Sequence, residues 1–295
     1  MNNTVPLAHP PFARRTLLTA LGTATLATLA ACTGIGTATP TPRPPASPSP
    51  SKTRKPGPIA YGQLASTATG DTRNWIIYYP PGTKIGDKLP VVIALHGLGD
   101  TIAMTEVQHY ATHLADAVAN GVTPFAIAAI DGGTLIWQKV GNQDAGALVA
   151  TDFVALLKQR GLNTARLALT GWSMGGWGTL RLACDELHGK LRAVAALSTP
   201  CYANSAQVPD NTWMTPAEFD ANNFYNRTDQ LTGLPIFLAC GISDGFYPGN
   251  VSFAARLTST GGVLAPVIDF TPGGHSPDYW ESVVPAQFRF LGEHL

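Results

Sequence analysis

Charged residues are scarce in this sequence. They make up 13% of its 295 residues, whereas hydrophobic residues make up 45%. A composition so poor in charge and so rich in apolar side chains argues against a disordered chain and against a nucleic-acid-binding one. The length suits one large domain or two small ones.

Acidic residues are missing from the first 57 positions, which contain six basic residues. Residues 58–295 contain 13 basic and 19 acidic residues, which gives this part a formal charge of −6. A mildly acidic domain does not favour a polyanionic substrate, and we expect no nucleic acid among its partners.

The N-terminus lacks an apolar run long enough to cross a membrane. The run Leu17–Ala31 has 15 residues, and a spanning helix needs about 20. It follows Arg14-Arg15 and ends in small residues, which is typical of an export signal over residues 1–31. The paired arginines resemble a twin-arginine signal. The alternative is an ordinary basic start that happens to contain two arginines.

The apolar run ends in Leu29-Ala30-Ala31-Cys32, which resembles a bacterial lipobox. Cleavage there leaves Cys32 at the new N-terminus carrying lipid, so we predict a lipoprotein on the outer face of the cytoplasmic membrane. The alternative is an ordinary signal-peptidase site with an incidental cysteine, which predicts a secreted protein. Residues 32–58 are rich in proline, serine and threonine, and this predicts an extended tether.

Short apolar runs alternate with helical patterns from residue 59 onward. The expected strands are 75–79, 91–95, 125–130, 167–170, 194–197, 236–240 and 267–270, and the expected helices are 103–119, 147–160, 176–187, 251–260 and 279–294. Continuous apolar strands between amphipathic helices predict an α/β domain over 59–295, with a mostly parallel sheet covered by helices on both faces.

One motif carries a nucleophile. Gly171-Trp172-Ser173-Met174-Gly175 matches G-x-S-x-G, and it stands between an expected strand and an expected helix. This context makes the motif a nucleophile elbow, in which a strained turn pushes the serine hydroxyl out at the carboxyl edge of the sheet. The alternative is a glycine-rich turn with a surface serine.

A serine hydroxyl needs a base and an orienting acid, which follow it in the chain order Ser, acid, His in this kind of site. His275 is the one histidine in a turn after the last expected strand, so we predict it as the base. Asp244 lies in the turn after strand 236–240 and is the predicted acid; a turn-capping aspartate is the alternative. Asp269 lies inside an expected strand and is not favoured.

The negative oxygen of a tetrahedral intermediate needs N–H donors that are already in place. We predict the backbone amide of Met174 as one donor and that of Leu98, in the loop Leu95–Asp100, as the other. His96 in the same loop is expected to hold the loop in place rather than to take part in the chemistry.

These motifs resemble the esterase D-like group of α/β-hydrolases, which is related to acyl esterases and mycolyltransferases. The resemblance also includes Gly132-Gly133 with Trp137, and Gly273-Gly274-His275 followed by Tyr279-Trp280. It extends from about residue 60 to the end of the chain. It implies an α/β-hydrolase fold and ester hydrolysis or acyl transfer without metal or organic cofactor.

Residues 200–233 form an irregular, aromatic-rich stretch between two strands. We interpret it either as a small cap that offers apolar walls to an acyl chain or as a packed surface excursion. The residues that we expect to line the substrate pocket are Trp137, Trp172 and Trp213.

Cys201 and Cys240 lie near the ends of neighbouring strands, and an exported protein can form disulfides, so this pair is the candidate for a bridge, with two free thiols as the alternative. Cys184 is expected to be a buried thiol. The spacing of cysteines and histidines does not predict a metal site.

Three functions compete. A serine carboxylic-ester hydrolase that acts on a small-molecule, lipid or carbohydrate ester is favoured. An acyltransferase to a sugar or glycerol acceptor shares the same acyl-enzyme. A non-catalytic ligand-binding lipoprotein is disfavoured because serine, acid and histidine are all present.

Overall fold

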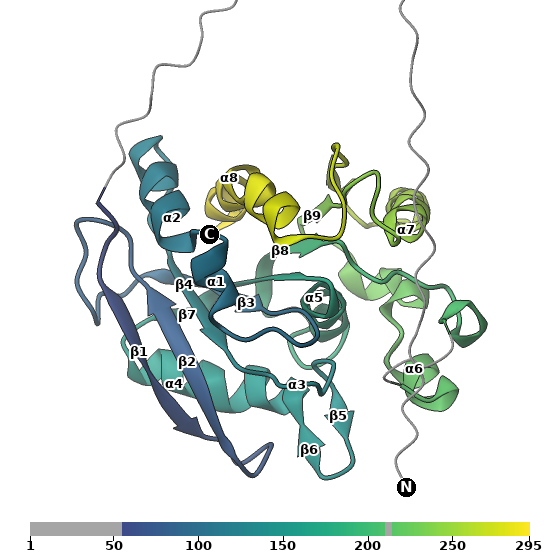
Figure 1. Cartoon of the computed structure of the whole chain (residues 1–295), viewed down its shortest axis with the longest axis horizontal. Coiled ribbons are helices and arrows are strands. Elements are labelled where there is room, and N and C mark those ends of the chain that lie inside the picture. The colour runs from purple at the N-terminus through teal and green to yellow at the C-terminus, as the bar shows by residue number, and fades with distance from the viewer. Residues whose placement is uncertain (1–54, 210–213) are drawn as a thin grey trace, which may run out of the picture. The chain divides into compact units, whose positions relative to one another are not determined.

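The computed structural model describes residues 55–209 and 214–295 (Figure 1). The predicted export signal, most of the tether and Cys32 lie outside these residues, so what the sequence predicts for them stays a prediction. No helix within the described parts of the chain is long and apolar enough to cross a bilayer.

Eight strands form one sheet in the order β1-β2-β4-β3-β7-β8-β9-β10 (Figure 1). Their bounds are β1 Ile59–Ala65, β2 Thr72–Tyr78, β3 Pro90–Leu95, β4 Ala126–Ile130, β7 Asn163–Trp172, β8 Leu191–Leu197, β9 Ile236–Ala239 and β10 Val267–Asp269. Strand β2 runs antiparallel to β1 and β4, and the pairs from β4 to β10 are parallel. The prediction of a mostly parallel sheet is confirmed. Strand β1 was not predicted, because its exposed and half-buried residues do not form an apolar run.

Helices cover both faces of the sheet. One face carries α1 Met104–Val107, α2 Tyr110–Ala119 and α8 Pro277–His294. The other carries α3 Ala145–Ala147, which continues through the π-helix η1 Leu148–Phe153 into α4 Val154–Gln159, together with α5 Met174–Cys184 and α7 Tyr247–Ser259. A small hairpin of β5 Lys139–Val140 and β6 Gln143–Asp144 precedes α3.

The central strands are buried on both faces. In β3, Val91, Ile93 and Leu95 pack toward α4 and α5, whereas Val92 and Ala94 pack toward α2 and α8. Successive side chains of a strand point to opposite faces, so a strand between two helical layers needs an apolar residue at every position. This is why the buried strands were recognisable in the sequence as continuous apolar runs.

The prediction of one continuous helix over 103–119 is wrong. The structure divides it at His109, whose backbone is left-handed with a φ of 48°, so α1 ends before this residue and α2 begins after it. The Nδ1 atom of His109 lies 2.7 Å from Glu281 of α8, which links the break to the neighbouring helix.

Phe288 joins α8 to α2, because its buried ring makes edge contacts with Tyr110 and Phe125 at 5.1 and 5.9 Å. We expect Phe288→Ala to lower the free energy of unfolding by about 3–5 kcal/mol, since it removes a large buried ring and leaves a cavity. Urea denaturation measures this change. The control is Arg289→Ala at the exposed neighbouring position, which we expect to stay within about 0.5 kcal/mol of wild type. Equal effects would contradict this account of the interface.

Candidate active site

Ser173 stands at the turn between β7 and α5. Its φ of 57° and ψ of −121° are rare for a residue with a side chain. The strain is held by two backbone hydrogen bonds: the amide of Ser173 donates to Leu197 at 2.9 Å, and its carbonyl accepts from Trp177 at 3.1 Å. The turn is therefore fixed to the end of β8 on one side and to the first turn of α5 on the other.

The glycines of the motif are required by close packing on β3. A Cβ atom added at Gly175 would collide with the carbonyl oxygen of Leu95, and one added at Gly171 would meet the carbonyl of Gly175 first and lie 2.8 Å from the Leu95 oxygen. The elbow thus rests directly on the end of β3, where only glycine leaves room for the backbone.

His275 lies between Ser173 and Asp244. Its Nε2 atom is 3.0 Å from the Ser173 Oγ atom, and its Nδ1 atom is 2.9 Å from the Asp244 Oδ2 atom. The rings of Phe246 and Trp280 meet the imidazole nearly at right angles, each with a centroid distance of 5.1 Å. The structure brings the three residues predicted from the sequence into one hydrogen-bonded chain, and two aromatic rings hold the middle one.

The Asp244 carboxylate is buried, and several donors reach it. They are the His275 ring, the backbone amide of Phe246 at 2.9 Å, the hydroxyl of Ser198 and the thiol of Cys240. Burial by itself would raise the pKa of this carboxyl, but the hydrogen bonds outweigh burial and lower it below its usual value. Asp244 is therefore ionised at neutral pH although its side chain is 1% exposed.

Ser198 is directed at Asp244 by Trp280. The indole Nε1–H of Trp280 donates to the Ser198 Oγ atom at 3.0 Å, and both residues are buried. Because the oxygen accepts this bond, its own hydrogen is free to point at the carboxylate. Ser198 also has a left-handed backbone, with a φ of 48°, at the end of β8. Sequence reasoning gave Ser198, Phe246 and Trp280 no role; the nearness of Phe246 to Asp244 and of Trp280 to His275 in the chain was the available signal.

Asp269 lies inside β10, where it pairs in register with Ala239 of β9. Its carbonyl accepts from the Tyr279 hydroxyl at 3.2 Å. The prediction that this aspartate belongs to a strand is confirmed, and no hydrogen bond between it and His275 occurs in the described part of the chain.

His96 braces the loop after β3. Its Nδ1–H donates to the carbonyl of Gly97 and its Nε2 atom accepts from the amide of Gly132, both at 2.8 Å. An imidazole with one donor and one acceptor nitrogen is neutral. Burial lowers the pKa of His96, since it penalises the charged ring. The ring thus ties two loops together, as the sequence analysis expected.

Of the two predicted oxyanion donors, Leu98 lies in this loop and Met174 lies at the start of α5. Leu98 is 45% exposed and sits in the turn that the amide of Asp100 closes on Gly97 at 3.2 Å. Met174 is the first residue of α5, and an amide in the first turn of a helix has no acceptor within the helix. Both therefore occupy backbone positions suited to the predicted role.

Two of the three predicted pocket residues are wrong. Trp137 and Trp172 are 0% and 1% exposed, so neither can form the wall of a pocket. They brace the loop Leu95–Asp100: Trp137 donates to the carbonyl of His96 at 3.1 Å, and Trp172 donates to Asp100 at 2.8 Å. Trp213 lies outside the described residues.

The predicted disulfide is also wrong for this structure. Cys201 and Cys240 are both free and buried. The Sγ atom of Cys201 lies 4.0 Å from Asn250, while Cys240 hydrogen-bonds with Ser198 and Asp244. Cys184 is a buried free thiol, as predicted. No cluster of metal ligands occurs within residues 55–209 and 214–295.

The segment 200–233 contains the 3₁₀ turns η2 Ser205–Gln207, η3 Phe224–Asn226 and η4 Thr228–Leu231 and the helix α6 Pro216–Asn222. Phe219 and Phe224 are buried against Trp177 of α5 at 5.2 and 5.0 Å, whereas Tyr202 and Tyr225 stay partly exposed. The buried rings of Phe219 and Phe224 fasten the segment to α5, as the packed-excursion interpretation expects, and the cap interpretation stays a prediction.

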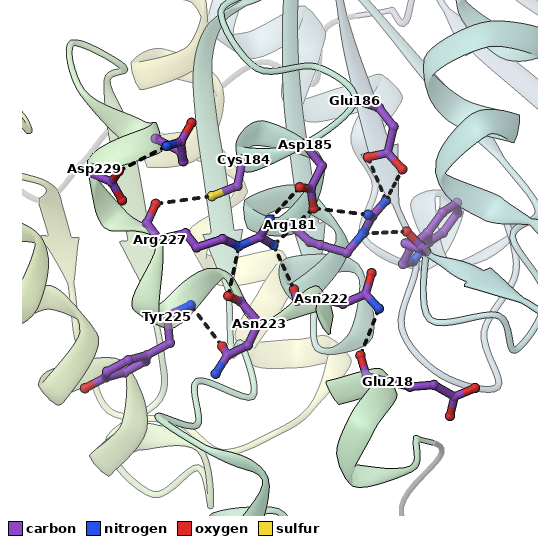
Figure 2. Close-up of polar contacts among 12 residues, drawn as sticks. Arg181, Cys184, Asp185, Glu186, Glu218, Asn222, Asn223, Tyr225, Arg227 and Asp229 are labelled. Atoms are coloured by element: carbon purple, nitrogen blue, oxygen red, sulfur yellow. Dashed lines mark hydrogen bonds and ion pairs between the residues drawn. The ribbon is translucent and has the colours of Figure 1, made fainter. Parts of the chain in front are cut away.

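An ionic cluster anchors the same segment to the end of α5 (Figure 2). Arg227 binds Asp185 through two nitrogens, one of them at 3.1 Å. The buried Arg181 of α5 binds both oxygens of Glu186 at 2.9 Å and the carbonyl of Trp137 at 3.0 Å. The cluster thus connects the segment, the end of α5 and the turn that contains Trp137.

The neutral His96 makes stability depend on pH. Its folded pKa lies below the unfolded value of about 6.5, so its contribution is complete above that pH and is lost as the pH falls. We expect the stability advantage of wild type over His96→Gln to shrink between pH 7 and pH 5, by up to about 1.4 kcal/mol per pH unit. Urea titrations across this range measure it. A difference that stays constant across this range would contradict a neutral buried ring at His96.

Several known proteins resemble this chain. The model of the Esterase family matches residues 66–291. Among solved structures, a ferulic acid esterase is 21% identical, with a TM-score of 0.69, and the match covers 81% of this chain and 98% of that one. An S-formylglutathione hydrolase from Agrobacterium tumefaciens is 15% identical, with a TM-score of 0.66 and coverage of 80% and 95%. Mycobacterium tuberculosis MPT51 is 14% identical, with a TM-score of 0.65 and coverage of 81% and 99%.

No curated protein sequence matches the chain. The structural matches, at these low identities, show a shared α/β-hydrolase fold, as predicted. The family model spans well over half of the sequence and includes the elbow, the acid turn and the histidine turn. The chain therefore belongs to the Esterase family.

Proposed function

We propose that this protein hydrolyses carboxylic esters through an acyl-enzyme formed on Ser173. The observation that carries the proposal is the continuous chain from the Ser173 hydroxyl through His275 to the buried Asp244, with hydrogen-bond distances of 3.0 and 2.9 Å. This arrangement of nucleophile, base and orienting acid is the one that acyl transfer requires.

The first step forms the acyl-enzyme. His275 Nε2 takes the hydroxyl proton as Ser173 Oγ attacks the carbonyl carbon of the ester, and a tetrahedral intermediate forms. The ionised Asp244 accepts a hydrogen bond from Nδ1–H, which fixes the tautomer and stabilises the imidazolium. When the intermediate collapses, the proton passes from Nε2 to the departing alcohol oxygen.

The negative oxygen of the intermediate is assigned to the amides of Leu98 and Met174. Removing one such donor typically costs about 10²–10³ in rate. The Leu98 turn is held by the His96, Trp137 and Trp172 hydrogen bonds, and Met174 is held by the elbow. Both donors are thus fixed before the substrate binds, and little reorganisation is needed as charge develops.

The second step repeats the first with water. His275 takes a proton from a water molecule, whose oxygen attacks the acyl carbonyl, and then returns the proton to Ser173 Oγ as the acid leaves. His275 is 35% exposed, so solvent reaches the base. Access of water to the histidine is the feature that supports hydrolysis as the fate of the acyl-enzyme.

We expect Ser173→Ala to lower ester hydrolysis by about 10⁴-fold or more, because the nucleophile is lost. Initial rates on 4-nitrophenyl acetate measure this, and a fluorophosphonate should label Ser173 in wild type and leave the variant unlabelled. The control is Ser243→Ala, at an exposed serine beside Asp244, which should keep near-normal rates. Substantial hydrolysis by a well-folded Ser173→Ala protein would refute the proposal.

Two aspartates precede His275, and we expect them to behave differently. Asp244→Asn should lower kcat by about 10³–10⁴-fold with a smaller change in KM, since the amide cannot hold the imidazole in the right tautomer and charge. Asp269→Asn, within β10, should change mainly stability. Steady-state kinetics of both variants under one set of conditions decides the question. A collapse of kcat in Asp269→Asn beside a near-normal Asp244→Asn would reverse the assignment.

A further inference from the structure

A cavity of about 440 Å³ lies beside the acid turn. The lining residues on which the argument depends are Tyr202, Gln207, Tyr225, Gly245, Phe246 and Ser252. They come from the segment after β8, from η3, from the turn before α7 and from α7 itself. The volume lies within the range of about 300–1,000 Å³ that is typical of small-molecule sites.

One residue connects the cavity to the reacting groups. The Phe246 ring forms part of the wall and packs edge-on against the His275 imidazole at 5.1 Å. It also meets the ring of Tyr202, another wall residue, at 6.2 Å. The cavity is therefore one aromatic ring away from the proton-transferring histidine.

The walls are suited to an uncharged ring. They include the aromatic side chains of Tyr202, Tyr225 and Phe246, which offer flat apolar faces. Polar atoms come from the amide of Gln207 and the hydroxyl of Ser252, and none of the described residues that line the cavity carries a formal charge at neutral pH. Burial raises the pKa of both tyrosines, so they stay neutral.

The position of the cavity indicates which part of an ester it receives. His275 Nε2 must hand its proton to the departing alcohol oxygen, so the alcohol extends from Ser173 toward the histidine. The Phe246 ring lines the cavity and packs against the imidazole of His275 at 5.1 Å, so the cavity is next to the residue that hands over this proton. The predicted oxyanion donors, Leu98 and Met174, belong instead to the β3 loop and to α5.

We propose that the cavity bounded by Tyr202, Tyr225 and Phe246 binds an uncharged cyclic group carried by the alcohol portion of the ester. The inference rests on the proposed function of Ser173. It adds a substrate class to that function: esters of alcohols that bear a neutral ring. An apolar cavity of about 150 Å³ is enough for benzene, so this one has room for one or two rings.

Two variants fill the cavity from opposite sides. Ser252→Trp places an indole on an exposed lining position of α7. Gly245→Leu adds a side chain where a Cβ atom meets nothing within 4 Å and the backbone is not left-handed. The matched control is Val251→Trp, next to Ser252 in α7, which is 41% exposed and does not line the cavity. Using two variants keeps the test valid if one of them fails to fold.

Three esters separate the two sides of the substrate. Benzyl acetate and methyl phenylacetate are isomers that carry the same ring on the alcohol side and on the acyl side, and methyl acetate has no ring. We expect both filling variants to lower kcat/KM for benzyl acetate by about tenfold or more, the effect of losing one buried ring. Rates on methyl acetate and methyl phenylacetate should stay within about twofold of wild type, and Val251→Trp should change none of the three.

The remaining outcomes overturn the proposal. A loss confined to methyl phenylacetate would make the cavity an acyl site, and unchanged rates on all three esters would show that it binds neither part. Failure of the proposed function has a different signature, which is no hydrolysis of any ester by wild type. In that case, thermal shifts of Ser173→Ala with and without Ser252→Trp in the presence of benzyl alcohol test the cavity alone; equal shifts would overturn it.

Discussion

The contact between the elbow and the end of β3 is the constraint on which the rest of the site depends. Ser173 takes a left-handed backbone, and it can do so only because Gly171 and Gly175 let the turn rest on the carbonyl of Leu95. The same packing sets the start of α5 and places the loop Leu95–Asp100, which continues directly from β3. One close backbone approach therefore positions Ser173 and both predicted oxyanion donors together.

The second determinant is a buried chain of polar groups. It runs from Trp280 through Ser198, Asp244 and His275 to Ser173, and its members come from α8, the end of β8 and three different turns. Burial of a carboxylate is costly unless hydrogen bonds compensate for lost hydration. Here the compensating donors also fix the direction of the carboxylate, so one set of bonds both stabilises the charge and orients the base.

The large aromatic residues divide into those that build the scaffold and those that face open space. Trp137, Trp172 and Trp177 are buried. The first two hold the loop Leu95–Asp100 through their indole N–H groups. Tyr202 and Tyr225 remain partly exposed along the cavity beside the acid turn. The ionic cluster of Arg181, Asp185 and Arg227 keeps the segment that carries these tyrosines attached to the nucleophile helix (Figure 2).

The sequence by itself determined the backbone of this site. A strand, a glycine-flanked serine and a helix in succession specify the elbow, and Asp244 and His275 were identified because each follows a strand on a turn. Patterns of this kind are local, since strand and turn preferences act over a few residues. The antiparallel edge strand β1 could not be predicted from such local patterns, because its exposed and buried residues form no apolar run.

Only the tertiary structure decided where the side chains point. Burial of Trp137 and Trp172, the separate partners of Cys201 and Cys240, and the bond from Trp280 to Ser198 depend on groups brought together by the fold. The Trp280 and Ser198 partners are 82 residues apart in the chain, and His275 and Ser173 are 102 apart. A side chain takes the direction in which its polar atoms find partners and its apolar atoms are covered, and both conditions are set by residues that are distant in the sequence.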